Sequence, residues 1–105
     1  MAKREVFIWL KSGCKTIDVR KGLPWNGDVA KFQCGQNYLE LPIVKKETGL
    51  LSQVIRQDNY TRIIPSARTL DEALDYLRRI YGGDGGVFTA YHLATSNSNS
   101  RFEKP

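Results

Sequence analysis

The chain is poor in the residue types that metal sites and disulfide scaffolds need. Its 105 residues include two cysteines, one histidine and one methionine. Two cysteines are too few for a disulfide framework, and Cys14, Cys34 and His92 stand far apart, without the paired spacing of a zinc site. The sequence therefore predicts no metal site and no cofactor, and we expect both cysteines to be structural thiols in a reducing compartment.

Long apolar runs are also missing. A transmembrane helix needs about 18 to 20 uncharged apolar residues in a row. The apolar run near the N-terminus, residues 6–10, has only five, which is also too short for the apolar part of a signal peptide. We therefore expect a soluble cytoplasmic protein with neither a signal peptide nor a membrane anchor.

Motifs of the common catalytic sites are absent as well, namely a nucleophile elbow, a phosphate-binding loop and an HExxH helix. The glycine-rich stretch 82–86 follows a predicted helix and precedes a predicted strand, the reverse of the order in a phosphate loop, so it is interpreted as a helix stop. His92 shares a strand face with Phe88 and Ala90, which favours a packed core residue over a general base. We expect no catalytic residue. An enzyme would need His92 and an acid such as Asp84 in one cleft.

What the chain does have is the composition of a folded domain. Hydrophobic residues make up 41% and charged residues 26% of the chain, which is ordinary globular usage. A chain of this length has room for one hydrophobic core. Residues 96–105 are almost entirely polar. We expect a single α+β domain over residues 1–95 and a disordered polar tail over 96–105.

Alternating segments separated by turn formers predict antiparallel hairpins. Ser12-Gly13 supplies the first turn and Gly35-Gln36-Asn37 the second. Because Pro42 has no backbone N–H to donate, its strand is expected at a sheet edge or broken near that residue. The predicted strand pairs are 6–10 with 15–20, and 29–34 with 38–44.

The second half of the chain contains the best helix signal. Thr69 and Glu72 have the spacing of a capping box, and an amphipathic helix is predicted over about 69–81. A final strand over about 87–94 has apolar residues on both faces, which favours a central position in a sheet. Residues 50–57 fit a helix or a third hairpin, and we favour the hairpin.

These elements predict an α+β fold with a mostly antiparallel sheet built from hairpins. One amphipathic helix covers one sheet face and leaves the other face to solvent or to a partner. An open apolar face is often closed by a second copy of the chain. A homodimer is therefore one of the expected forms.

Positive charge is concentrated in the first half of the chain. The formal net charge is +5, and residues 1–46 hold nine basic against four acidic side chains, so this half accounts for the whole excess. Such an asymmetry is typical of a face that meets phosphates or an acidic protein surface. Solvated lysines along sheet edges explain it equally well.

The sequence favours a non-enzymatic interaction module that binds an acidic protein surface or its own copy. The alternative is a nucleic-acid-binding protein that uses the basic hairpins of residues 1–46, since aromatic and basic residues interleave there and exposed aromatics on a sheet can stack on bases. Trp25, which follows Pro24 in a turn, is the aromatic most expected near the surface. The predicted binding residues are Arg20, Lys21, Trp25 and Lys31.

Overall fold

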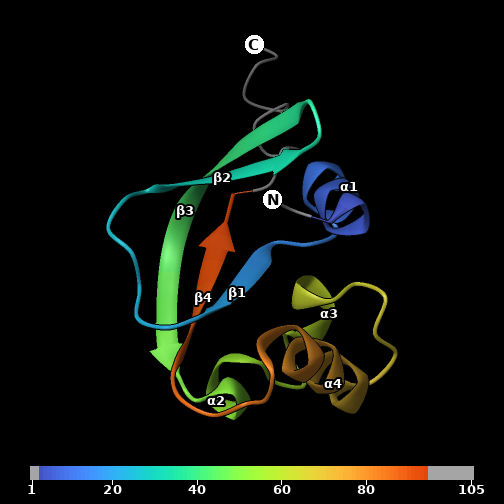
Figure 1. Cartoon of the computed structure of the whole chain (residues 1–105), viewed down its shortest axis with the longest axis vertical. Coiled ribbons are helices and arrows are strands. Elements are labelled where there is room, and N and C mark those ends of the chain that lie inside the picture. Colours follow the sequence, from blue (N-terminus) through green and yellow to red (C-terminus); the bar gives the residue numbers. More distant parts are fainter. Residues whose placement is uncertain (1–2, 95–105) are drawn as a thin grey trace.

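A curled antiparallel sheet is the frame of the fold (Figure 1). The computed structural model describes residues 3–94, which contain four helices and four strands, so the α+β class and the antiparallel sheet are confirmed. The predicted tail over 96–105 lies outside the described residues. The sheet order is β1-β4-β3-β2. The elements are α1 (Arg4–Ser12), β1 (Ile17–Lys21), β2 (Val29–Cys34), β3 (Asn37–Gly49), α2 (Leu51–Val54), α3 (Tyr60–Ile63), α4 (Leu70–Tyr81) and β4 (Phe88–Leu93).

Strand β4 is central, as its apolar residues on both faces predicted. It pairs with β1 on one side and with β3 on the other. Phe88 and Ala90 belong to one buried cluster, whereas Tyr91 and Leu93 belong to a second. Because neighbouring residues of a strand point to opposite faces, the two clusters lie on opposite faces of the sheet.

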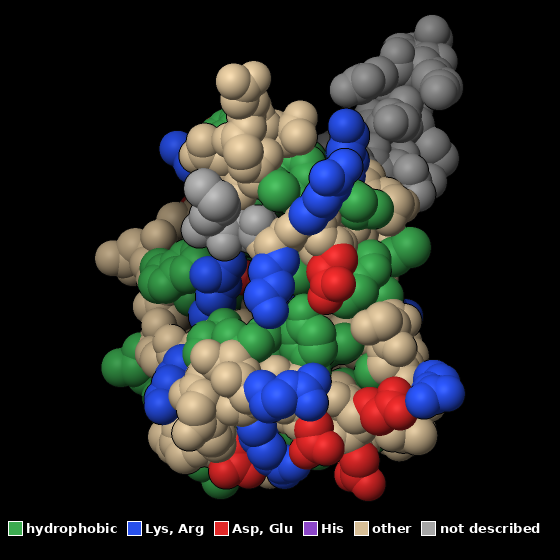
Figure 2. All heavy atoms as spheres, turned by 45° about the vertical axis from the view of Figure 1, so that its right-hand side comes forward, with side chains coloured by type: hydrophobic (Ala, Val, Ile, Leu, Met, Phe, Trp, Pro, Cys, Tyr) green, Lys and Arg blue, Asp and Glu red, His purple; other side chains and the backbone are tan. Residues whose placement is uncertain are grey.

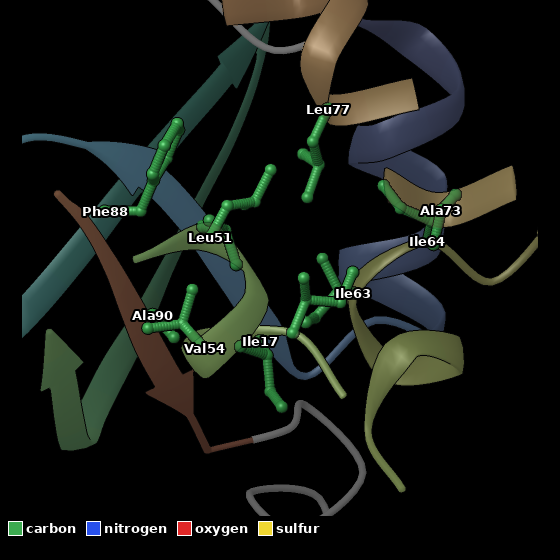
Figure 3. Packing of buried hydrophobic residues seen from close by; sticks show 11 residues of the cluster. Ile17, Leu51, Val54, Ile63, Ile64, Ala73, Leu77, Phe88 and Ala90 are labelled. Carbon is green, nitrogen blue, oxygen red and sulfur yellow. The ribbon is translucent and has the colours of Figure 1, made fainter. Parts of the chain in front are cut away.

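The first cluster lies between the sheet and three helices, α2, α3 and α4. The alternation predicted for residues 15–20 is confirmed here, since Ile17 and Val19 of β1 both point into this cluster. Figure 3 shows apolar side chains from the strands and from all three helices converging on one interior. The residues labelled there are Ile17, Leu51, Val54, Ile63, Ile64, Ala73, Leu77, Phe88 and Ala90.

The second cluster lies beneath α1 on the opposite face. Phe7 and Leu10 of α1 pack with Ala30 and Phe32 of β2 and with Tyr91. The expectation that one helix covers one face, with the other face open, is therefore wrong. This expectation fails because residues 6–10 and 50–57, for which the sequence favours strands, contribute to helices α1 and α2.

The first of these segments is residues 6–10, which belong to α1 and form no strand. Phe7 and Leu10 are buried three positions apart while Ile8 between them is exposed, which is a helical pattern. The helix ends at Gly13, whose φ of 85° is accessible to glycine and whose N–H donates to the Leu10 carbonyl at 3.3 Å. With no strand at 6–10 to pair with, β1 pairs with β4 instead.

Residues 50–57 are the second correction, because they form α2 and a connection to α3 rather than a hairpin. The buried Asn59 side chain holds this connection. Its amide oxygen accepts from the Arg56 N–H at 2.7 Å, and its amide nitrogen donates to the Val54 carbonyl at 3.1 Å. One asparagine side chain thus satisfies two backbone groups of the connection between α2 and α3.

The second predicted hairpin is confirmed as β2 and β3, joined by a tight turn at Gly35-Gln36. Strand β3 neither ends at Pro42 nor lies at the edge of the sheet. It pairs with β2 up to Pro42 and with β4 from Ile43 onward, with a register shift between Ile43 and Lys45. The expected break is therefore a change of partner within one long strand.

Thr69 caps α4, and its replacement by alanine is expected to lower the free energy of unfolding by about 1 kcal/mol. The Thr69 hydroxyl accepts from the Glu72 N–H at 3.2 Å, while the Glu72 carboxylate accepts from the N–H of Arg68 rather than closing the predicted box on Thr69. Urea unfolding of Thr69→Ala checks this. Thr61→Ala is the control, an exposed threonine expected to change stability by less than about 0.5 kcal/mol. Equal effects of the two substitutions would contradict the capping role.

Candidate binding surface

The loop of residues 22–28 crosses one face of the sheet. Strands β1 and β2 lie at opposite edges, so the segment that joins them has to pass over the strands between. It passes over the face of Tyr91, because the Trp25 ring stacks on the Tyr91 ring with centroids 4.4 Å apart and planes 22° apart. The turn predicted around Trp25 thus places an indole against the central strand.

Hydrogen bonds with side chains of β3 and β4 hold this loop against the sheet. The Trp25 N–H donates to the Tyr91 hydroxyl at 3.1 Å, and the Lys46 ammonium donates to the Trp25 carbonyl at 2.6 Å. At the start of the loop, the Thr89 hydroxyl donates to the Gly22 carbonyl at 2.8 Å. Trp25 is therefore held by its ring, its N–H and its carbonyl, and yet 47% of its surface is exposed.

Arg20 completes the surface around Trp25. Its Nε donates to the Asp18 carboxylate at 2.7 Å, and its guanidinium carbon lies 5.9 Å from the centre of the Trp25 ring, within cation–π distance. Asp18 is buried, so this ion pair fixes the direction of the Arg20 side chain. We call Arg20, Trp25, Lys46 and Tyr91 together the Trp25 patch.

The structure brings together only two of the four predicted binding residues, Arg20 and Trp25. Lys21 is exposed at the end of β1 and lies opposite Phe88, on the face that carries α2, α3 and α4. Lys31 is exposed on β2 and lies opposite Glu40. One ligand laid over Trp25 would therefore not reach all four side chains.

Sequence reasoning missed Lys46 and the buried Tyr91, which hold Trp25 in place. Lys46 lies beside Tyr91 in the β3–β4 ladder, and both residues are distant from Trp25 in the chain. The alternation of residues 87–94 predicts that Tyr91 faces away from Ala90, which is the only signal the sequence offers. Nothing local connects either residue with the loop.

His92 lies on the other face of β4 and is only partly buried, contrary to the packed core residue that the sequence favoured. Its Nε2 lies 2.7 Å from a Glu47 carboxylate oxygen. This hydrogen bond, together with the charges of Lys45 and Arg56, lowers the pKa of Glu47 below its usual range. Asp84 lies elsewhere and contacts Arg78 at 3.3 Å. The surroundings of His92 are those of a surface ion-pair network.

Acidic and basic side chains are distributed differently over one face of the molecule. On the face shown in Figure 2, most of them lie in the lower part, at the level of α4, whereas lysines and arginines are spread over the whole height. Helix α4 contributes Asp71, Glu72 and Asp75.

No protein-family model, curated protein or solved structure matches this chain. Within residues 3–94, none of the helices has the length and apolar character to cross a membrane. Over the same residues no three histidine, cysteine or acidic side chains are grouped as metal ligands would be, and Cys14 and Cys34 are free thiols. The function must be argued from the surface itself.

Exposed apolar side chains adjoin the Trp25 patch along the chain. Leu23 lies in the same loop and is 72% exposed, and Val29 directly follows the loop and is also exposed. Val44, at the register shift of β3, is 67% exposed. Val44 itself lines a shallow hollow between the loop and β3. The other lining residues are Gly27 and Asp28 of the loop and Ile43, Lys45 and Lys46 of β3. The loop is therefore bordered by apolar surface as well as by positive charge.

Proposed function

We propose that this protein is a non-enzymatic interaction module that binds an acidic surface of a partner protein through the Trp25 patch. The observation that carries the proposal is that Trp25 is half exposed although its ring, N–H and carbonyl are all fixed. An aromatic side chain that is already ordered loses little entropy on binding. Tryptophan and arginine are also the residue types most enriched among those that dominate binding energy.

Charge supports an acidic partner. Arg20 and Lys46 flank the indole. Asp18, the carboxylate closest to Arg20, is buried and bonded to it, so it offers little negative charge to an approaching surface. A partner with carboxylates around an apolar pocket would complement both the ring and its flanking cations.

A single-stranded nucleic acid is the second candidate, because Arg20 and Trp25 form the cation and aromatic pair on which a base can stack. The separate positions of Lys21 and Lys31 count against it. Titration with short oligonucleotides at low and at near-physiological salt discriminates the two candidates. Micromolar binding that falls steeply with salt and is lost in Trp25→Ala would replace the protein partner by nucleic acid.

Trp25→Ala is expected to weaken partner binding at least about tenfold, the loss typical of a dominant interface residue. Proteins retained by the wild-type chain but not by Trp25→Ala are to be purified and titrated by calorimetry. Ile80→Ala on α4 is the matched control, since Ile80 is 46% exposed. Equal affinities of wild type and Trp25→Ala for a purified partner would overturn the proposal. A dimer that Trp25→Ala dissociates would show that the occupant is a second copy.

A further inference from the structure

The two edges of the sheet differ in how their backbone groups are satisfied. On β1, the residues that point away from β4 include Ile17 and Val19. The Lys15 ammonium donates to the Ile17 carbonyl at 2.9 Å, and the Tyr81 hydroxyl donates to the Val19 carbonyl at 2.8 Å. Side chains therefore occupy this edge and prevent another strand from pairing there.

Among residues 3–94, no side chain covers the β2 edge by bonding to its outward backbone groups. The Ile43 N–H donates to the Asp28 carbonyl at 2.6 Å, which fixes the alternation of the β2–β3 ladder. In this alternation the pairs Ala30–Leu41 and Phe32–Leu39 exchange hydrogen bonds. The backbone groups of the intervening residues point away from β3, and no other described residue bonds to them. These outward residues of β2 are Val29, Lys31 and Gln33.

The side chains of β2 separate into two faces in the same alternation. Ala30 and Phe32 are buried with α1, whereas the three outward residues are all exposed. A strand added at this edge would continue both faces. Its residues beside Ala30 and Phe32 would border the α1 cluster, and those beside Lys31 would lie at the surface.

Charge along this edge selects the added strand. Lys31 is the charged residue among the three outward ones. At the hairpin end, Arg4 and Lys11 of α1 line a hollow of about 450 Å³ with the β2–β3 turn, and none of the described residues that line it is acidic. Opposite charges stabilise cross-strand neighbours and like charges destabilise them. The edge therefore favours a strand with acidic residues on the Lys31 face.

A second copy of β2 fits this edge poorly. Antiparallel pairing that engages all three outward residues of both copies is centred on Lys31 and sets the two Lys31 side chains opposite each other. A lysine placed at an edge in this way is a common device against self-association. Charge thus disfavours the homodimeric alternative at this edge.

We infer that the β2 edge binds an extended acidic segment of a partner protein as an additional antiparallel strand. Main-chain bonds to Val29, Lys31 and Gln33 would hold the segment, and carboxylates opposite Lys31 would select it. The inference rests on the proposed function and names the form of the partner. The β2 edge begins directly after the loop that carries Trp25, so one continuous segment of the chain joins the two surfaces.

The probe is a short capped peptide in which valine and glutamate alternate, added to the full-length ¹⁵N-labelled chain. Hydrogen exchange at the amides of Val29, Lys31 and Gln33 is expected to slow when the peptide binds. The same peptide with lysine in place of glutamate is the control. Equal protection by both peptides, or no protection by the acidic one, would overturn the inference. Protection of these amides in the free protein would also overturn it, because the edge would already be occupied.

Two substitutions at Lys31 distinguish the contribution of its backbone N–H to peptide binding from the contribution of its side-chain charge. Lys31→Thr keeps the N–H and is expected to weaken peptide binding about fivefold. Lys31→Pro also removes the outward N–H and is expected to weaken it about tenfold further. Proline fits an outward position of an edge strand, because it removes no bond to β3. Equal affinities of the two variants would exclude strand addition.

A fold check accompanies these variants, namely tryptophan fluorescence and the amide spectrum. Should Lys31→Pro not fold, a peptide N-methylated at alternate residues tests the same bond on the wild-type chain, and undiminished binding of that peptide would overturn the inference. One outcome is that a purified partner binds Trp25→Ala more weakly than wild type and binds Lys31→Pro as tightly as wild type. This result would support the proposed function and contradict only the strand addition. Loss of affinity with both variants would support the two together.

Discussion

Tyr91→Ala is expected to lower the free energy of unfolding by about 3 to 5 kcal/mol, the range for removing a buried aromatic side chain. Tyr91 is 1% exposed and fills the cluster beneath α1 with Phe7 and Leu10. Its hydroxyl also accepts the Trp25 N–H. Alanine would leave a cavity in the core and would remove the surface on which the indole stacks.

Urea unfolding measures this loss, and indole fluorescence in the folded state, recorded in a Trp9→Phe background so that Trp25 is the remaining tryptophan, reports the release of the loop. Tyr91→Phe is the control, because it keeps the ring and removes only the hydrogen bond, at a cost of about 1 kcal/mol. A Tyr91→Ala protein with unchanged stability and indole environment would contradict the contacts on which the Trp25 patch depends. Equal losses in both variants would assign the effect to the hydroxyl rather than to the stacked ring.

Elements with strong local signals could be predicted from the sequence. Thr69 and the apolar spacing after it predict α4, the turn at Gly35-Gln36 predicts the β2–β3 hairpin, and the two-faced apolar pattern of β4 predicts its central place. In each case the information lies within about a dozen residues, so local physics decides the outcome.

The failures have a different cause. Residues 6–10 and 50–57 are apolar runs of a length at which helix and strand patterns cannot be told apart. Their state is decided by tertiary contacts, such as Phe7 against Phe32 and the Asn59 bonds that join α2 to α3. Strand pairing is equally non-local, and the β1–β4 pair unites the two ends of the described chain.

The candidate site depends on the same long-range contacts. Arg20 and Trp25 were predicted because each is basic or aromatic near a turn, and they do meet. Lys46 and Tyr91 could not be predicted, since they reach Trp25 only once the loop has crossed the sheet. Lys31 is separated from these residues by the sheet order, and it gains a different role at the β2 edge.

Lys15 is expected to make the protein more stable as the pH rises from about 8 to 10.5. The side chain is buried, and its ammonium donates to the carbonyls of Ile17 and Ile63. Burial is the main cause that lowers the pKa of Lys15 from 10.5 to about 8, while nearby Asp18 raises it and Arg20 lowers it further. Between these two pH values the unfolded chain holds a proton that the folded chain has released, so the free energy of unfolding increases with pH.

The expected gain is about 3 kcal/mol over this interval, since one pKa unit corresponds to about 1.36 kcal/mol. Urea unfolding of wild type and Lys15→Met at several pH values measures it. Burial raises the pKa values of Tyr76 and Tyr81, which lowers stability above pH 10 in both proteins and cancels in the difference between them. Loss of two carbonyl contacts in Lys15→Met displaces its curve by a pH-independent amount. Parallel curves for the two proteins would show that Lys15 titrates normally and that its burial does not affect its charge.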